Sequence, residues 1–137
     1  ITAVAHKHLL NKVLQDAVKY NNPDLILSFM QCHPTFHPIA NYNEVLILAS
    51  EKGLIGLVQK LLKYPHIDPT SRDSLALRRA STSGHEQVVD ELLNDGRANP
   101  AAERNYAIIW ASAEGHLRVV QRLMADKRVD PTAVANG

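Results

Sequence analysis

The chain has 137 residues, of which 15 are basic and 14 acidic, and its formal net charge at pH 7 is +1 with neutral histidines. This balance provides no global field that would hold nucleic acid or a membrane surface, so neither is expected as a partner. Hydrophobic residues make up 45% of the chain and aromatic residues only 5%, which favours one domain of packed helices with a core of Leu, Val, Ile and Ala.

The sequence also carries no sign of a membrane anchor or a secretory signal. It has no run of about 18 apolar residues, and its first eight residues lack the charged start and long apolar core of a signal peptide. The single cysteine, Cys32, cannot form an internal disulfide, which fits a reducing compartment. We expect this thiol to be half-buried and inert.

The first 40 residues predict two helices. Apolar residues of a leading helix over about 3–20 recur at the spacing of one helix face, at Leu10, Val13, Leu14, Ala17 and Val18. The two asparagines that follow are suited to end this helix, and Pro23 is suited to open a second one over 24–31. Two prolines within 32–38 then predict a loop, because proline removes a backbone donor and restricts the residue before it.

From about residue 41 the sequence repeats at a constant interval of 31 residues. The first copy contains Ala49-Ser50, Gly53, Leu57-Val58 and Leu61-Leu62. The later copies contain Ala80-Ser81, Gly84, Val88-Val89 and Leu92-Leu93, and then Ala111-Ser112, Gly115, Val119-Val120 and Leu123-Met124. A period of this length is typical of solenoids, whose units bury their apolar faces against one another. We therefore expect the paired Leu and Val positions to be buried.

Each copy predicts two helices joined at its glycine. The inner helices are expected over 44–52, 75–83 and 106–114, and the outer helices over 54–63, 85–94 and 116–125. The glycine lets the chain reverse between them, because it takes positive φ without steric cost. Asn43, Ser74 and Asn105 recur just before the inner helices and are predicted to be their N-caps.

The run Gly-His-x-x-Val-Val-x-x-Leu-Leu from Gly84, preceded by Ala80-Ser81, resembles the ankyrin repeat. Three copies cover about two-thirds of the chain, and a diverged first copy precedes them. The resemblance implies one all-α solenoid domain of about four helix pairs, with repeats at roughly 1–40, 41–71, 72–102 and 103–137. It implies a curved array whose concave face, formed by the inner helices and loop tips, binds other proteins without catalysis. The period of 31 falls short of the family's usual 33, which implies abbreviated projecting loops.

The natural protein is expected to extend beyond this sequence. The chain opens on Ile1, and Asn136 falls in register with Asn105, Ser74 and Asn43. We therefore expect more repeats or another domain at one or both ends.

In-register positions that differ between copies are the predicted partner contacts. Trp110 with Arg79 is the first choice, because Trp and Arg most often anchor interfaces. The alternative is that Trp110 packs as core between two repeats. The full predicted set, from inner-helix columns and loop tips, is Leu48, Lys52, Arg79, Ser83, Trp110, Glu114, Tyr42, Asp73 and Arg104.

No catalytic, metal or cofactor site is predicted. Cys32, His33 and His37 form the tightest group of candidate metal ligands, but no second cysteine or nearby acidic residue completes the four that zinc usually needs. His85 and His116 occupy one slot in two copies, which favours a structural role near a helix start. The sequence offers no convincing nucleophile and base, and no glycine-rich phosphate loop.

The sequence therefore predicts a protein-binding module or scaffold, monomeric and cytoplasmic, that is not an enzyme. If the protein is a secreted effector, its compartment is the host-cell cytoplasm. Two alternatives stay open. The segment positions a larger enzyme or a host-directed effector on its target, or it is a purely structural spacer.

Overall fold

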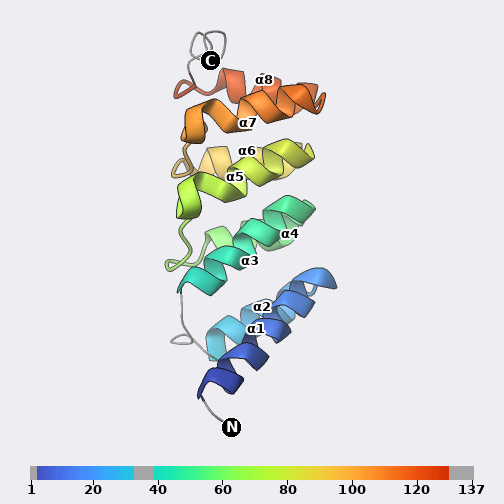
Figure 1. Ribbon diagram of the computed structural model, residues 1–137, viewed down its shortest axis with the longest axis vertical. Helices are drawn as coiled ribbons and strands as arrows, with labels where there is room; N and C mark the ends of the chain where they lie inside the picture. Colours follow the sequence, from blue (N-terminus) through green and yellow to red (C-terminus); the bar gives the residue numbers. More distant parts are fainter. Residues whose placement is uncertain (1–2, 33–38, 130–137) are drawn as a thin grey trace.

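The computed structural model describes residues 3–32 and 39–129 (Figure 1). This part of the chain contains eight α-helices and no β-strand, which confirms the predicted all-α class. The helices are α1 (Ala3–Lys19), α2 (Pro23–Cys32), α3 (Ile39–Lys52), α4 (Ile55–Leu62), α5 (Ser71–Ser83), α6 (Glu86–Asp95), α7 (Ala102–Ala113) and α8 (Leu117–Ala125). They form successive pairs that stack in chain order into one elongated array, with α1 and α8 at opposite ends (Figure 1).

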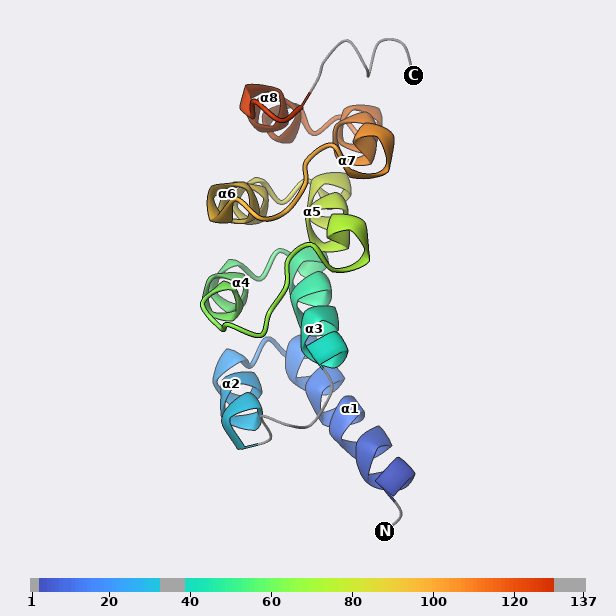
Figure 2. The ribbon, with the colours of Figure 1, turned by 90° about the vertical axis from the view of Figure 1, so that its left-hand side faces the viewer.

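The array has two layers. Figure 2 shows the inner helices α1, α3, α5 and α7 in one layer and the outer helices α2, α4, α6 and α8 in the other. The repeated apolar positions lie between the layers, and the side chains with almost no exposed surface include Leu57, Val58, Leu61, Val88, Val89, Leu92 and Leu123. Burial of each such side chain stabilises the fold by about 1.5 to 3 kcal/mol relative to exposure. One core therefore runs through all the repeats.

Burial differs from the prediction at the end of the array. Met124 was expected in the core, yet 51% of its surface is exposed, whereas Leu93, one period earlier, is buried. Leu62, two periods earlier and also predicted to be buried, is half-buried. A further helix pair stacks beyond both Leu62 and Leu93, whereas no further pair stacks on α7 and α8 within the described residues. Burial at this position therefore depends on the neighbouring repeat.

Each glycine that joins two helices has positive φ. Two of these glycines are also in close contact with the histidine ring of the next repeat. The His85 ring lies over Gly53, and its Nε2 is 2.8 Å from the Glu51 carbonyl oxygen. His116 repeats the arrangement over Gly84, with Nε2 3.0 Å from the backbone oxygen of Thr82. Because a carbonyl only accepts, Nε2 carries the hydrogen in both rings. The two histidines are therefore structural, as predicted, and they join adjacent repeats.

The predicted N-cap role of Asn43, Ser74 and Asn105 is wrong. Asn43 Oδ1 accepts from the backbone N–H of Asp68 at 2.8 Å, and Ser74 Oγ accepts from Asn99 N–H at 2.8 Å. These hydrogen bonds join consecutive repeats instead of capping the following helix. Ser74 and Asn105 have φ of 58° and 65°, which is the left-handed region and not the extended geometry of an N-cap.

The left-handed residues form short turns at the starts of α5 and α7. Residues 72–74 and 103–105 all have φ between 53° and 65°, so the regular right-handed helices begin near Leu75 and Tyr106, as predicted. Left-handed geometry costs a non-glycine residue about 1 to 2 kcal/mol. In α5 the Arg78 guanidinium offsets part of this cost by donating to the carbonyl oxygens of residues 72 and 73, at 2.8 and 3.0 Å.

A second connection between repeats is an aspartate and arginine pair that the sequence analysis missed. Arg97 binds Asp95 through Nε at 2.8 Å and donates to the Ile67 carbonyl oxygen of the preceding repeat at 3.1 Å. Arg128 binds Asp126 in the same way and donates to the Ala98 carbonyl oxygen at 2.8 Å. Hydrogen bonds from these arginines hold the pKa of both carboxyls below the ordinary value.

Candidate binding surface

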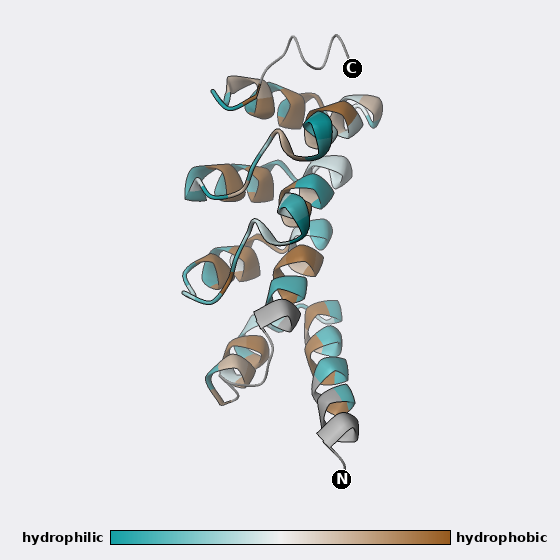
Figure 3. Ribbon diagram, turned by 60° about the vertical axis from the view of Figure 1, so that its left-hand side comes forward, coloured by the Kyte–Doolittle hydropathy of each residue, from teal (hydrophilic) through white to brown (hydrophobic). Residues whose placement is uncertain are grey.

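The inner helices turn one face toward the outer layer and leave the opposite face open. Figure 3 shows hydrophobic residues in both helix layers and mostly hydrophilic loops between the repeats. On the open face, the position shared by α3, α5 and α7 holds Leu48, Arg79 and Trp110, which we call the middle row. Leu48 is half-buried, and Arg79 and Trp110 are exposed. The inner-helix face therefore presents an apolar, a cationic and an aromatic side chain in succession.

Within the described residues Trp110 is not enclosed between two repeats, since 44% of its surface is exposed and α7 is the last inner helix described. Its ring packs on Tyr106, one helical turn earlier, with 5.8 Å between the ring centroids. The Arg78 guanidinium of the preceding repeat lies 5.1 Å from the centroid of the Tyr106 ring, within the range of a cation–π contact. These contacts hold one side of Trp110 in place and leave the other open.

The remaining predicted contacts lie in two places. Lys52, Ser83 and Glu114 are exposed at the C-terminal ends of the inner helices, so this column changes charge from repeat to repeat. Asp73 and Arg104 are exposed in the left-handed turns at the opposite ends. The structure thus separates the helix-end and loop-tip residues by the length of an inner helix, with the middle row between them.

Tyr42 does not belong to the surface, and its prediction as a partner contact is corrected. Only 4% of its surface is exposed, and it is part of the hydrophobic core. In its repeat, α3 begins at Ile39, so Tyr42 lies inside a helix where Asp73 and Arg104 lie in left-handed turns. Burial raises the pKa of the Tyr42 phenol.

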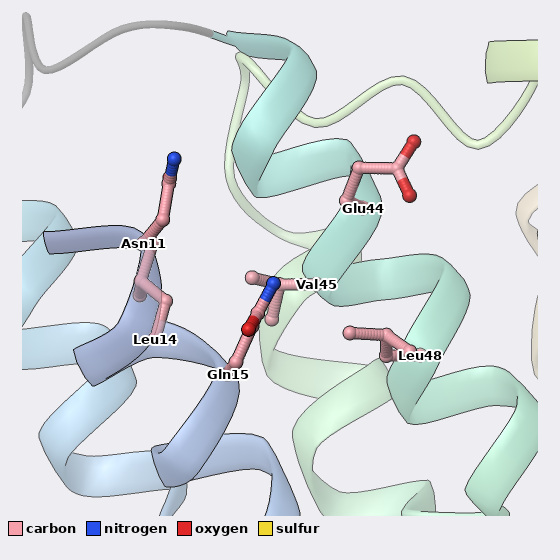
Figure 4. A pocket seen from close by; sticks show the side chains of 6 residues that line it. All are labelled: Asn11, Leu14, Gln15, Glu44, Val45 and Leu48. Carbon is pink, nitrogen blue, oxygen red and sulfur yellow. The ribbon is translucent and has the colours of Figure 1, made fainter. Parts of the chain in front are cut away.

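A groove between α1 and α3 extends the surface toward the N-terminal end, and the sequence analysis did not find it. Its volume is about 290 Å³, and Figure 4 shows its lining residues, Asn11, Leu14, Gln15, Glu44, Val45 and Leu48. The Glu44 carboxylate on its rim is paired with Arg72 of α5 at 2.7 Å. Leu48 belongs to both the groove and the middle row. The groove therefore continues the inner-helix face past α3.

The described residues offer little for other functions. They contain no group of three or more His, Cys, Asp or Glu side chains that could hold a metal ion. Cys32 is exposed and not half-buried as expected, and His33 and His37 lie outside the described residues. Among the helices of the described ranges, none has both the length and the apolar character needed to cross a membrane.

Helix pairs stacked in two layers, with a mixed apolar and charged inner face, define a helical-repeat protein. A family model for ankyrin repeats in three copies matches residues 46–135, which is more than half of the chain. The chain belongs to the ankyrin repeat family, whose members are generally protein–protein interaction modules. Comparisons with curated proteins and with solved structures gave no match.

Proposed function

We propose that this chain is a non-catalytic module that binds another protein on its inner-helix face. The observation that carries the proposal is the middle row, where Arg79 and Trp110 are exposed at equivalent positions of the neighbouring helices α5 and α7. Trp and Arg are common interface anchors. Trp offers a large contact area with few rotatable bonds, and Arg offers several hydrogen-bond donors in a fixed, planar arrangement. The helix-end and loop-tip residues would form the rim of the contact.

The scaffold suits recognition by a preformed surface. Each inner helix is connected to the next repeat, by the glycine–histidine contacts to the start of the following outer helix and by the hydrogen bonds of Asn43 and Ser74 to the following loop. A surface held in this way loses little conformational entropy when a partner binds. In this proposal the domain acts as a monomer in the cytoplasm. The single cysteine of the sequence has no internal partner for a disulfide, which fits a reducing compartment.

Affinity capture with quantitative mass spectrometry tests the proposal. The test variant is Arg79→Ala with Trp110→Ala. The matched control is Arg118→Ala with Leu117→Ala, which removes one exposed arginine and one large exposed apolar side chain from outer helix α8. Circular dichroism must show equal helix content in all three proteins.

A partner retained by the wild type and the control, but lost from the inner-face variant, supports the proposal. Equal retention by all three proteins would place binding elsewhere. Absence of any specific partner would favour the spacer alternative.

A further inference from the structure

The chemistry of the inner-helix face narrows the kind of partner, provided that the proposed function is correct. Arg79 is the cation of the middle row, and it remains available for a partner. Its guanidinium makes no ion pair with any described residue, whereas Arg72 is paired with Glu44 and Arg78 donates to backbone carbonyls and lies over a ring. An exposed guanidinium without an internal counter-charge favours a partner that supplies a carboxylate.

Most acidic side chains of the inner helices lie at the helix ends, and the one that approaches the middle row, Glu44 beside Leu48, is already paired with Arg72. Asp73 and Glu103 are in the left-handed turns, and Glu51 and Glu114 are at the opposite helix ends. The residues that directly precede the middle row in α3, α5 and α7 carry no negative charge. They are Ile47, Arg78 and Ile109. The centre of the face is therefore cationic and apolar, between two ends that carry carboxylates. A basic segment would be repelled at Arg79, and an acidic one attracted.

The spacing of the repeats sets the pattern that the partner must carry. Packed helices lie about 8 to 10 Å apart, so neighbouring side chains of the middle row are separated by about that distance. In an α-helix, residues seven apart share a face and are separated by about 10.5 Å along the axis. In a polyproline helix, residues three apart share a face and are separated by about 9.3 Å.

We propose that the middle row binds an acidic segment in which a carboxylate reaches Arg79 and flanking apolar side chains cover Leu48 and Trp110. Leu48 also opens into the groove beside α1, which offers space for the apolar side chain at that end. Trp110 offers an aromatic face at the other end.

The single tryptophan of the chain gives a direct assay, because Trp110 is itself in the middle row. Two end-blocked synthetic peptides serve as probes. One is a helix former with Leu, Glu and Leu at seven-residue spacing, and the other is proline-rich with the same three residues at three-residue spacing. Matched peptides carry Lys in place of Glu. Each is titrated into the protein while tryptophan fluorescence is recorded at low and at physiological salt.

At least one Glu peptide should change the fluorescence saturably and bind about tenfold more tightly than its Lys counterpart. Added salt should narrow this difference. Arg79→Glu should reverse the preference, so that the Lys peptide binds better, while Arg118→Glu on the outer helix should leave both affinities unchanged. Because Arg79 is exposed, Arg79→Gln should stay folded and lose the preference without reversing it.

Equal binding of Glu and Lys peptides, tighter binding of the Lys peptides, or no binding by any probe would overturn the acidic-segment proposal. The proposed function fails separately. If affinity capture still yields a partner that depends on Arg79 and Trp110, the inner face binds a protein of different chemistry. The proposed protein-binding function is then retained and only the acidic-segment proposal fails.

Discussion

Replacing Gly84 by alanine should cost more stability than replacing Gly115, although both glycines have almost the same backbone conformation. Their φ angles are +79° and +78°, so each alanine pays about 1 to 2 kcal/mol for left-handed geometry. At Gly84 an added Cβ would also lie 2.5 Å from His116 Nδ1, whereas at Gly115 it meets nothing within 4 Å.

The imidazole has to move to admit the alanine Cβ at position 84. Its hydrogen bond to the Thr82 carbonyl oxygen is then lost or lengthened, at a further cost of about 0.5 to 1.5 kcal/mol. We expect Gly84→Ala to lower the free energy of unfolding by about 1.5 to 3.5 kcal/mol and Gly115→Ala by about 1 to 2 kcal/mol. The effect of the alanine on the unfolded chain is the same at both sites and cancels in the comparison.

Urea unfolding measured by circular dichroism and by Trp110 fluorescence tests this prediction. The fluorescence follows the repeat that contains Gly115, so local unfolding at the end of the array is not missed. Gly84→Ala combined with His116→Ala should cost less than the two single changes added together, because the clash is then removed. Equal costs for the two glycines, or full additivity in the double variant, would refute the proposed contact between ring and glycine.

Three further outcomes follow from the core and from the connections between repeats. Leu92→Ala should lower the free energy of unfolding by about 2 to 5 kcal/mol because Leu92 is fully buried, while the exposed Leu117→Ala should change it by less than about 0.5 kcal/mol in the same urea titration. Ser74→Ala should cost about 1 to 3 kcal/mol, since it leaves the Asn99 N–H without its acceptor; thermal unfolding would show no shift if that hydrogen bond were unimportant. The stability that Asp95 contributes should be present above about pH 4 and lost as the pH falls through its lowered folded-state pKa. Asp95→Asn should therefore lower the free energy of unfolding at pH 7, and its difference from the wild type should shrink as the pH falls below about 4. Equal stability of the two proteins at pH 7 would contradict the pair.

Helix positions followed from local information. The interval of 31 residues, the apolar spacing and the joining glycines predicted the helices to within a few residues, because helix periodicity and glycine turns are properties of short stretches. The exception is α3, which begins at Ile39 and not near residue 44 as predicted. The outer helices begin one residue later than expected, since Leu54, His85 and His116 have non-helical ψ of 76° to 81° and precede the first helical residue. The middle row also followed from the register, since equal spacing places equivalent positions on one face.

The errors concern residues whose surroundings come from another repeat. The sequence pattern places Asn43 and Ser74 at predicted N-cap positions. Their side-chain oxygens instead accept a hydrogen bond from a backbone N–H 25 residues further along the chain. Tyr42 shares a register with exposed loop-tip residues, yet an earlier helix start carries it into the core. The groove beside α1 depends on how two helices pack, which no local pattern records.

The sequence by itself therefore determined the repeat, the helix pairs and the position of the variable residues, since each depends on a few neighbouring residues. Only the tertiary structure decided which polar groups connect the repeats. Three kinds of contact do so: a histidine packed on a glycine, an arginine that donates to a carbonyl oxygen, and an asparagine that accepts from a backbone N–H. Each joins residues 25 to 34 positions apart. Their partners are set by the register of one helix pair on the next, which exists only once the array has stacked.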